Sequence, residues 1–349
     1  MRATRLVFTG IGKVEWESFE IPDVLQEDEI LVNARHSLIS PGTELAIFTG
    51  SHIGFSLPQP PFPLIPSNPG YALVGEVVCT GSGVAKDPAM GGIQVGQRVL
   101  VEAPHGTYGI VNARKNPPVI LPEEIPNDVA PFIRMAKIGI TALRVAPPRL
   151  GEPVLVLGMG LVGLLCAQLY RIAGSRPVVG TDLLDKRLEL AARFGITPLK
   201  GVRGEERESY TRTLRSLTGG KGPSMVIEAT GNPALLSLAL ELVAEGGRVI
   251  LLGSPRGMVQ LDAYSLIHRK AVSLIGAHER VQDLSLPVLG GWNRVANQDF
   301  LARLLAAGDI RTEGLITHRI PAREAPGMYS QMAVRPSDYL GVLLDWTEG

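Results

Sequence analysis

Three glycines that follow an apolar run have the spacing that a bound dinucleotide requires. Gly158, Gly160 and Gly163 are separated by one and two residues, and Leu161 and Val162 complete the motif. In a strand–turn–helix unit, the first glycine permits a tight turn, the second lets a pyrophosphate approach the backbone, and the third lets the helix pack closely on the strand. A helix that begins at Leu161 directs its N-terminus at the phosphates. The motif therefore predicts a dinucleotide site.

An acidic residue strengthens this prediction and selects the cofactor. Asp182 ends the next predicted strand, 19 residues after Gly163, where a carboxylate accepts both ribose hydroxyls and repels a 2′-phosphate. NAD is therefore predicted in preference to NADP. Arg187 keeps NADP open, because a guanidinium at this place can meet a 2′-phosphate. The favoured interpretation is a side chain on a helix that is solvated or paired with Asp185 or Glu189. The alternative is a purely structural role, in which the glycines are ordinary turn residues and Asp182 is a helix cap.

Strands and helices alternate around this motif in the order of a doubly wound sheet. Six short apolar runs have the length of buried strands, and helical patterns such as Asp185–Phe194 and Pro233–Ala244 separate them. This order predicts an α/β fold with a six-stranded parallel sheet of the Rossmann type. The predicted strands are Val154–Leu157, Pro177–Asp182, Ile196–Leu199, Met225–Thr230, Arg248–Gly253 and Val272–Gly276.

The first 125 residues have a different pattern. Short β-type runs are cut by turn residues, which predicts a mostly antiparallel β domain. Six prolines lie between Ser56 and Pro69, and this density predicts a long surface loop. The predicted strands of this region are Glu29–Ala34, Ala72–Val78, Gln97–Val101 and Thr107–Val111.

A linker helix and a C-terminal tail complete the predicted organisation. The helix is expected to be capped by Asn127 or Asp128 and to run to about Ala146. After Ala277 the alternation stops, and one helical run, Asp299–Ala307, precedes a strand-like close. We expect this tail to pack on the first domain, because about 70 residues would make a weak third domain. The predicted boundaries are a catalytic domain at residues 1–145, a nucleotide domain at 146–276 and the return at 277–349.

Composition limits the class of protein. The chain has 349 residues, with 34 Lys and Arg against 34 Asp and Glu. This balance gives none of the counterion release that nucleic-acid binders use, and no basic run indicates binding to an anionic membrane. The longest apolar stretch, Val154–Ala167, falls short of the ~20 residues of a membrane span. Two cysteines, Cys79 and Cys166, and an N-terminus without a signal-peptide pattern predict a cytoplasmic protein.

Taken together, these parts resemble the medium-chain dehydrogenase/reductase superfamily over essentially the whole chain. The run Glu228–Gly231 is similar to the fourth-strand motif of alcohol and polyol dehydrogenases, and Gly246–Gly253 also follows the superfamily pattern. The resemblance implies a GroES-like catalytic domain beside the Rossmann domain. It implies contacts from Thr141, Thr230 and Gly253 to the nicotinamide or its ribose, and a homodimer or homotetramer built through the nucleotide domain.

The positions at which zinc-dependent relatives carry their catalytic ligands have other residues here. By this resemblance, Pro41 stands at the place of a cysteine, Tyr71 at that of a histidine and Lys137 at that of the third ligand. Proline cannot ligate zinc, and two cysteines cannot make the four-cysteine structural lobe. We therefore predict no zinc and no other metal. A substitute metal site formed by His36, His52 and His105 stays open as the alternative, although no ligand spacing supports it.

A finer resemblance concerns lineage only. The segment His36–Glu44, followed by the proline-rich loop and Gly70-Tyr71, is similar to a branch that includes the bacteriochlorophyllide dehydrogenase of pigment synthesis. That branch also contains many uncharacterised oxidoreductases, so no substrate follows from it.

Without zinc, a side chain must stabilise the alkoxide that develops on the substrate during hydride transfer. Lys137 is the first candidate, because by the resemblance its position is that of a ligand aimed at the nicotinamide, and burial would lower the pKa of a lysine there toward neutrality. A solvated lysine on a helix face is the alternative. Thr43 resembles the relay hydroxyl of alcohol dehydrogenases and Tyr71 has a phenolic proton, although turn and packing roles stay open for both. Glu44 is expected to pair with Lys137 or to bind substrate hydroxyls, or else to be a solvated loop carboxylate. His278 lies where polyol dehydrogenases contact substrate, and it is a second candidate acid or base.

The leading hypothesis is an NAD-dependent, zinc-independent oxidoreductase that transfers hydride between nicotinamide and a secondary alcohol or ketone. The expected partner is a small polyhydroxylated substrate, such as a sugar or cyclitol. One alternative is an NADPH-dependent enoyl or quinone reductase, although those enzymes lack an acid at the position of Asp182. The other is a non-catalytic nucleotide-binding module, which the loss of the metal ligands keeps open.

Overall fold

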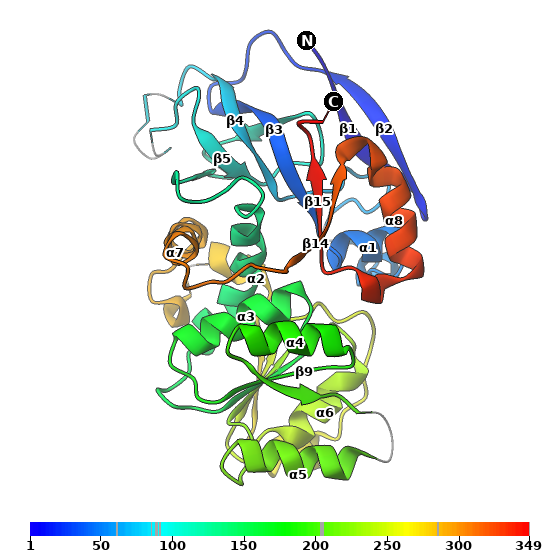
Figure 1. The fold of residues 1–349 in the computed structure, drawn as a ribbon, viewed down its shortest axis with the longest axis vertical. Helices are drawn as coiled ribbons and strands as arrows, with labels where there is room; N and C mark the ends of the chain where they lie inside the picture. The colour runs from blue at the N-terminus through cyan, green and yellow to red at the C-terminus, as the bar shows by residue number, and fades with distance from the viewer. Residues whose placement is uncertain are drawn as a thin grey trace. The chain divides into compact units, whose positions relative to one another are not determined.

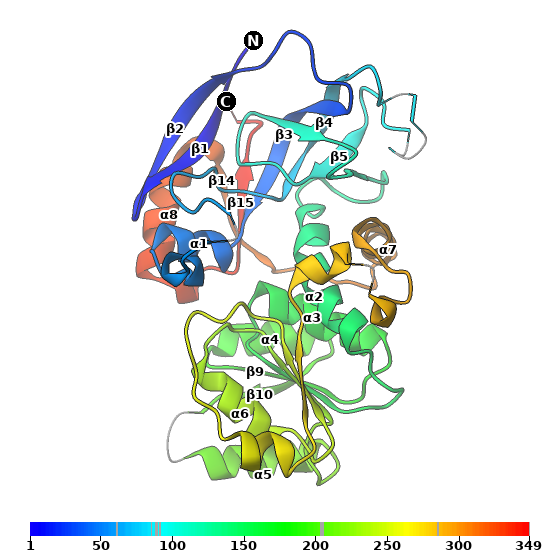
Figure 2. The same cartoon turned by 180° about the vertical axis from the view of Figure 1, so that it is seen from behind.

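The chain divides into two compact units, which are described here one at a time (Figures 1 and 2). The computed structural model describes residues 1–60, 62–84, 86–87, 90, 92–202, 206–284 and 286–348. The first unit comprises Met1–Arg134, Gln298–Ala307 and Thr312–Gly349, and the second comprises Met135–Asn297 and Gly308–Arg311.

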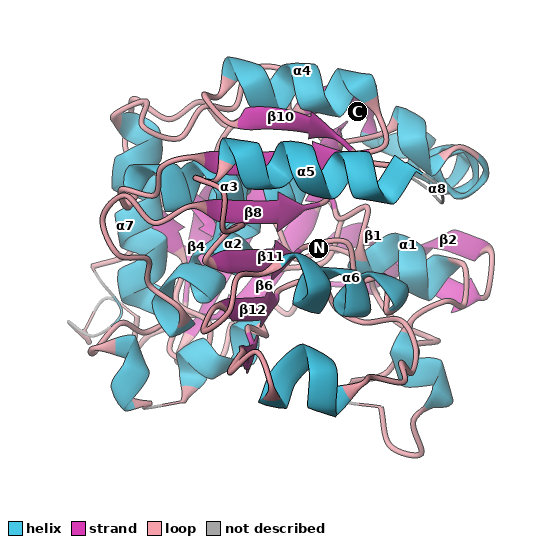
Figure 3. Ribbon diagram, turned by 90° about the horizontal axis from the view of Figure 1, so that it is seen from below, coloured by secondary structure: helices cyan, strands magenta, loops and turns pink. Residues whose placement is uncertain are grey.

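The second unit is built on a parallel sheet with the strand order β10-β9-β8-β11-β12-β13. Figure 3 shows helices α3 to α6 lying along these strands. The predicted Rossmann sheet is therefore confirmed, with strand ends within two residues of the predicted ones. The elements are β8 (Val154–Leu157), α3 (Leu161–Ile172), β9 (Val178–Asp182), α4 (Asp185–Arg193), β10 (Thr197–Lys200), α5 (Arg207–Leu217), β11 (Met225–Glu228), α6 (Ala234–Leu242), β12 (Arg248–Leu251), η4 (Tyr264–His268), β13 (Ser273–Gly276), η5 (Glu279–Asp283) and η6 (Pro287–Leu289).

Burial explains why these short apolar runs form strands. All residues of β8 and β11 are buried, as expected for parallel strands that are covered on both faces. Leu155 and Val226 share a core with Leu214 of α5 and Leu240 of α6. The order of the strands reverses where β8 meets β11, and ligands bind at the carboxyl ends of strands at such a switch point.

The first unit contains a seven-stranded sheet of the order β14-β15-β3-β4-β5-β7, with β6 also paired to β3. All pairs are antiparallel except β14 with β15, so the prediction of a mostly antiparallel domain is confirmed. The last strand pairs with β3. The elements are β1 (Arg2–Gly10), β2 (Lys13–Glu20), β3 (Glu29–Ile39), α1 (Thr43–Phe48), η1 (Ile53–Ser56), β4 (Leu73–Thr80), β5 (Arg98–Val101), β6 (Tyr108–Asn112), β7 (Val119–Ile120), β14 (Ile316–Pro321), η7 (Ala322–Glu324), α8 (Ala325–Val334), η8 (Pro336–Asp338) and β15 (Gly341–Asp345).

Two helices contribute residues to both units, α2 (Pro131–Val145) and α7 (Arg294–Ala306). The predicted cap of α2 is wrong, because the helix begins at Pro131, a residue that suits the first helical position. Asn127 instead accepts a hydrogen bond from Arg98 at 3.0 Å, and Asp128 pairs with Arg319.

The expectation of a single helix in the tail is also wrong. Besides α7, the tail contains α8, whose Tyr329 and Met332 pack in the core of the first unit. Pro326 and Gly327 interrupt the apolar period of α8, but a proline is compatible with the first helical turn. The hairpin of β1 and β2 was not predicted either, although the alternation around Trp16 was a signal for it.

Neither a regular helix nor a ladder strand forms between Leu57 and Pro69 among the described residues, as the proline density predicts. Pro61 lies outside the described residues. Within the part of the chain that the structure describes, no helix has both the length and the apolar character to cross a membrane.

Candidate functional site

The glycine turn after β8 has one glycine that the fold does not need. A Cβ at Gly158, whose φ is +94°, would lie 2.5 Å from Thr230 Cγ2, and a Cβ at Gly163 would lie 1.9 Å from the carbonyl oxygen of Gly158. At Gly160 φ is −70° and a Cβ would meet no atom within 4 Å. Chain packing thus explains two of the glycines, and the open space at Gly160 fits the pyrophosphate that the motif predicts.

We expect Gly160→Val to separate folding from cofactor binding. Because a Cβ at this position meets no atom within 4 Å, the melting temperature of the protein without cofactor should stay within about 2 °C of wild type. The Kd for NAD should rise at least about tenfold, since the side chain fills the space for the pyrophosphate. Calorimetric titration and thermal unfolding check both values, and unchanged NAD affinity would contradict this assignment of the turn.

Asp182 lies beside the glycine turn, at the end of β9. Its Oδ2 accepts a hydrogen bond from the backbone N–H of Met159 at 2.9 Å, and its Oδ1 accepts one from Leu184 N–H at 3.0 Å. Arg187 Nη1 lies 3.5 Å from Oδ2, so the expected pairing of Arg187 with Asp185 or Glu189 is wrong. The partner is Asp182, because the first turn of α4 brings the guanidinium back over the end of β9.

A buried carboxylate organises the loop after β11. Glu228 accepts hydrogen bonds from the N–H of Thr230 at 2.7 Å, from the Thr230 hydroxyl, and from Gly231 N–H at 3.0 Å. Burial raises the pKa of Glu228, and these hydrogen bonds oppose the rise. A Cβ at Gly253 would lie 2.3 Å from Gly231 N. Thr230 and Gly253 therefore lie together at the carboxyl ends of neighbouring strands. Glu228, which organises this loop, is the first residue of the motif Glu228–Gly231.

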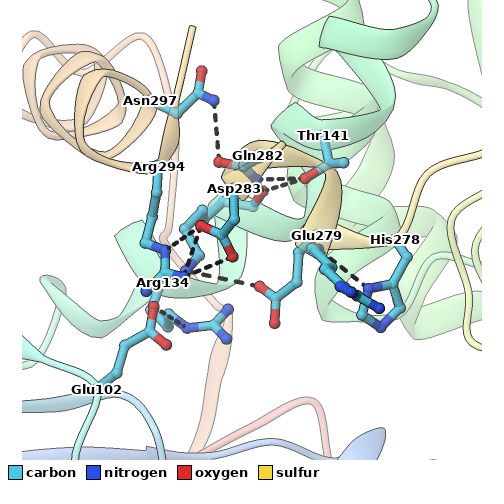
Figure 4. Close-up of polar contacts among 11 residues, drawn as sticks. Glu102, Arg134, Thr141, His278, Glu279, Gln282, Asp283, Arg294 and Asn297 are labelled. Carbon is cyan, nitrogen blue, oxygen red and sulfur yellow. Dashed lines mark hydrogen bonds and ion pairs between the residues drawn. The ribbon is translucent and has the colours of Figure 1, made fainter. Parts of the chain in front are cut away.

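Lys137 lies on α2 with only 3% of its surface exposed, so the alternative of a solvated lysine is wrong. Its Nζ lies 3.8 Å from Oε2 of Glu279 on η5. His278 caps that element, and its Nδ1 accepts a hydrogen bond from Arg280 N–H at 3.1 Å (Figure 4). A buried ammonium needs an anionic partner. The second unit thus brings an ammonium, a carboxylate and an imidazole onto two adjacent elements.

Thr141 follows Lys137 by one helical turn. Its hydroxyl is fully buried, donates to the carbonyl oxygen of Lys137 at 3.0 Å and receives a hydrogen bond from Gln282 Nε2 at 2.5 Å. The contact of Thr141 with nicotinamide stays a prediction. Gln282 was not predicted, because no motif surrounds it in the sequence.

Glu44 belongs to a buried polar network in the first unit. It accepts hydrogen bonds from Ser40 N–H at 3.0 Å, from His105 Nε2 at 3.0 Å and from the hydroxyl of Tyr329. The alternative of a solvated loop carboxylate is therefore wrong. Burial and the nearby Glu44 raise the pKa of Tyr329, so its hydroxyl remains a donor.

The other polar contacts of the network fix the tautomer of the imidazole. His105 Nδ1 lies 2.7 Å from the Ser37 hydroxyl, which also accepts a hydrogen bond from Trp346 Nε1 at 2.8 Å. A neutral His105 with its proton on Nε2 satisfies each of these groups. Each polar group of the network thus has a hydrogen-bond partner.

Thr43 and Tyr71 are both half-buried in the first unit. Thr43 is the first residue of α1, and the ring of Tyr71 lies under the guanidinium of Arg134, 4.5 Å from ring centroid to Cζ. Their roles in proton transfer stay predictions.

The residues at the three expected zinc-ligand positions do not fit the metal. Pro41 has no donor atom, Tyr71 contacts a cation, and Lys137 pairs as an ammonium with Glu279. Among the described residues, no group of three His, Cys, Asp or Glu side chains is arranged to hold a metal ion. The three histidines of the substitute site have separate partners, which are Asp345 for His36, Gly54 N–H for His52, and Ser37 with Glu44 for His105.

Comparison with known proteins gives consistent results. Residues 162–285 match the family described as "Zinc-binding dehydrogenase", a range that contains none of the three ligand positions. Sorbitol dehydrogenase of Bacillus subtilis strain 168 is 26% identical, over 71% of this chain and 74% of the relative.

Two solved structures share the fold over nearly the whole chain. Galactitol-1-phosphate dehydrogenase from Escherichia coli has a TM-score of 0.80 and 21% identity, covering 98% of this chain and 99% of the other. A putative zinc-binding dehydrogenase from Sinorhizobium meliloti 1021, bound to NADP, has a TM-score of 0.77 and 21% identity, covering 99% of both chains. These likenesses show a Rossmann domain with a GroES-like domain. The glycine turn, the Glu228 loop and these relatives support the assignment of the chain to the medium-chain dehydrogenase/reductase superfamily, among enzymes of the alcohol dehydrogenase type.

Proposed function

We propose that the protein is a zinc-independent, NAD-dependent oxidoreductase that transfers hydride between nicotinamide and a secondary alcohol or ketone of a polyhydroxylated substrate. The observation that carries this proposal is the buried Lys137 beside Glu279, at the position where zinc-dependent relatives have a ligand. A buried ammonium can do there what a metal cation does, which is to stabilise negative charge on the substrate oxygen.

Nicotinamide, when bound, supplies the hydride acceptor or donor. In oxidation, the amine of Lys137 takes the hydroxyl proton of the substrate; in reduction, its ammonium gives that proton back. Glu279, 3.8 Å from Nζ, stabilises the ammonium form and prevents an unpaired charge in the buried site. His278, which caps η5, is proposed to carry the proton between this site and water, and the relay roles of Thr43 and Tyr71 stay predictions from the resemblance.

The choice of NAD rests on Asp182. Its carboxylate is held at the end of β9 by Met159 and Leu184, where a 2′-phosphate would meet a negative charge. Arg187 lies 3.5 Å from the same carboxylate and offsets part of that charge, so NADP is the second choice. The polyol dehydrogenases among the relatives and the ammonium and carboxylate of Lys137 and Glu279 support the choice of a polyhydroxylated substrate.

A cofactor and substrate panel tests the proposal. The protein is incubated with NAD or NADP and with sugars, polyols, cyclitols and simple secondary alcohols, while reduced cofactor is followed by absorbance. We expect reduction of NAD with at least one polyhydroxylated alcohol. Turnover only of NADPH with enones or quinones would support the reductase alternative, and NAD binding without any turnover would support a nucleotide-binding module; either result contradicts the proposal.

We further propose that the protein is a cytoplasmic homodimer or homotetramer, whose catalytic domain comprises residues 1–145 and 277–349 and whose nucleotide domain comprises residues 146–276. The two cysteines, Cys79 and Cys166, are unpaired. β13 pairs only with β12 among the described strands, and its Leu274 is 38% exposed. An exposed sheet edge favours pairing with a second copy. Light scattering of the purified protein measures the number of subunits, and a monomer would contradict this assembly.

A further inference from the structure

Gln282 is a buried amide that joins the two elements of the Lys137 site. It lies on η5, three residues after Glu279, and 3% of its surface is exposed. In a 3₁₀ helix, residues i and i+3 eclipse one another, so Glu279 and Gln282 share a face. On α2, Lys137 and Thr141 share a face because they are four residues apart. The two faces meet through the contacts of Gln282.

Every part of the Gln282 amide is used in these contacts. Its Nε2 donates to the carbonyl oxygen of Lys137 at 3.0 Å and to the hydroxyl of Thr141 at 2.5 Å, and its Oε1 accepts from Asn297 Nδ2 at 3.1 Å. Figure 4 shows the side chain between Thr141 and Asn297. A flipped amide would place its oxygen against the Lys137 carbonyl, so the contacts allow one orientation.

The network continues to the last turn of α2. Asn297 Oδ1 accepts a hydrogen bond from Arg144 Nε at 2.9 Å, and the Arg144 guanidinium lies 3.5 Å from the ring centroid of Trp292. Burial lowers the pKa of Arg144 to about 10, which leaves it charged at neutral pH. α2 is therefore connected to η5 at Lys137 and, through Asn297, at Arg144.

We propose that Gln282 is a positioning residue of the reaction, which holds η5 on α2 so that the Glu279 carboxylate stays beside the Lys137 ammonium. This role rests on the proposed function, because it gives Lys137 its place in proton transfer. Gln282 itself contacts the backbone carbonyl of Lys137 and the hydroxyl of Thr141, and it acts through Glu279. Loss of its two donated hydrogen bonds releases η5 from α2 and lets the carboxylate move away.

The kinetic test compares two buried glutamines. Gln282→Leu should lower kcat about 10- to 100-fold, as expected when a reacting group is displaced by about 1 Å, while the KM for NAD stays within about twofold of wild type. Gln282→Glu keeps the size but loses both donors, and it should act in the same direction. The control is Gln168→Leu, which is also 3% exposed and loses hydrogen bonds of 2.8 and 3.1 Å to the Arg311 backbone. It should leave kcat unchanged.

A double-mutant cycle separates positioning from a general loss of stability. Glu279→Gln and Gln282→Leu together should lower kcat no more than the stronger single change, because both act through one ion pair. Additive losses in kcat would mean that Gln282 acts independently of Glu279, and they would overturn the proposal.

A measurement without turnover keeps this inference separate from the proposed function. The chain has eight lysines, so ¹³C labelling of their ε-carbons gives a spectrum in which Lys137→Met identifies the Lys137 signal. Glu279→Gln and Gln282→Leu should both move the titration midpoint of that signal to lower pH, because a carboxylate beside an ammonium favours its charged form. Gln168→Leu should leave it in place. A shift in an inactive protein would support the positioning role while the proposed function fails, and an unshifted signal in Gln282→Leu would overturn the positioning role.

Discussion

Replacing Lys137 with methionine is expected to lower kcat by about 10²- to 10⁴-fold, the usual contribution of a positioned acid or base. Methionine has similar length and no charge, so it fills the buried position without stabilising an alkoxide or moving a proton. The Kd for NAD should stay within about twofold of wild type. The reason is that Asp182, which we assign to NAD, is held by Met159 and Leu184, whereas Lys137 pairs with Glu279. Steady-state kinetics and calorimetric titration measure the two effects.

Two variants make this result specific. Lys137→Arg keeps the charge but does not release a proton at neutral pH, so it should remain far below wild type while binding substrate. Lys13→Met removes an exposed lysine of β2 and should leave kcat unchanged. Wild-type turnover by Lys137→Met would show that another group handles the substrate oxygen, and the proposed mechanism would then be wrong.

Replacing Glu44 with alanine is expected to lower the free energy of unfolding by at least about 3 kcal/mol, because each of three buried groups that loses its acceptor costs about 1–3 kcal/mol. The change leaves the Ser40 N–H, the His105 imidazole and the Tyr329 hydroxyl without their acceptor. These groups are buried, so water does not replace the carboxylate without structural change. Denaturant unfolding measures the effect, and an m-value equal to that of wild type shows that the change is one of stability.

The matched control is an acidic residue of the same unit that pairs at the surface. Glu17 lies 2.7 Å from Arg5 Nε, with 43% of its side chain exposed, and Glu17→Ala should cost only about 0.2–1 kcal/mol. Equal losses for the two variants would contradict the assignment of Glu44 as the buried acceptor that organises its network. The Glu44 network also holds the chain before Tyr71, because His105 N–H donates to the carbonyl oxygen of Pro69 at 2.8 Å.

The sequence predicts the nucleotide unit well because its signals are local. The glycine turn lies within six residues, and Asp182 ends the adjacent strand, so their contact follows from one strand–turn–helix unit and its neighbour. The short apolar strands are equally local, since the central strands β8 and β11 are buried throughout and are recognised as continuous apolar runs without long-range information.

The polar networks could not be predicted in the same way because their members are far apart in the chain. Glu44 meets His105 and Tyr329, which are 61 and 285 residues away, and Gln282 meets Thr141 across 141 residues. No spacing rule connects such residues before the fold is known. For Arg187 a local rule gave the wrong partner. The helix period favours pairing with residues of α4, but the structure pairs Arg187 with the carboxylate of Asp182 at the end of β9.

Turnover of the metal-free protein tests the central claim most directly. The protein is dialysed against a strong chelator, its zinc content is measured by mass spectrometry, and the rate of NAD reduction with the best substrate of the panel is compared before and after. The donor set at Pro41, Tyr71 and Lys137 predicts an unchanged rate at a zinc content far below one ion per chain. A rate that falls with the zinc content and returns when zinc is added back would contradict a mechanism in which Lys137 replaces the metal.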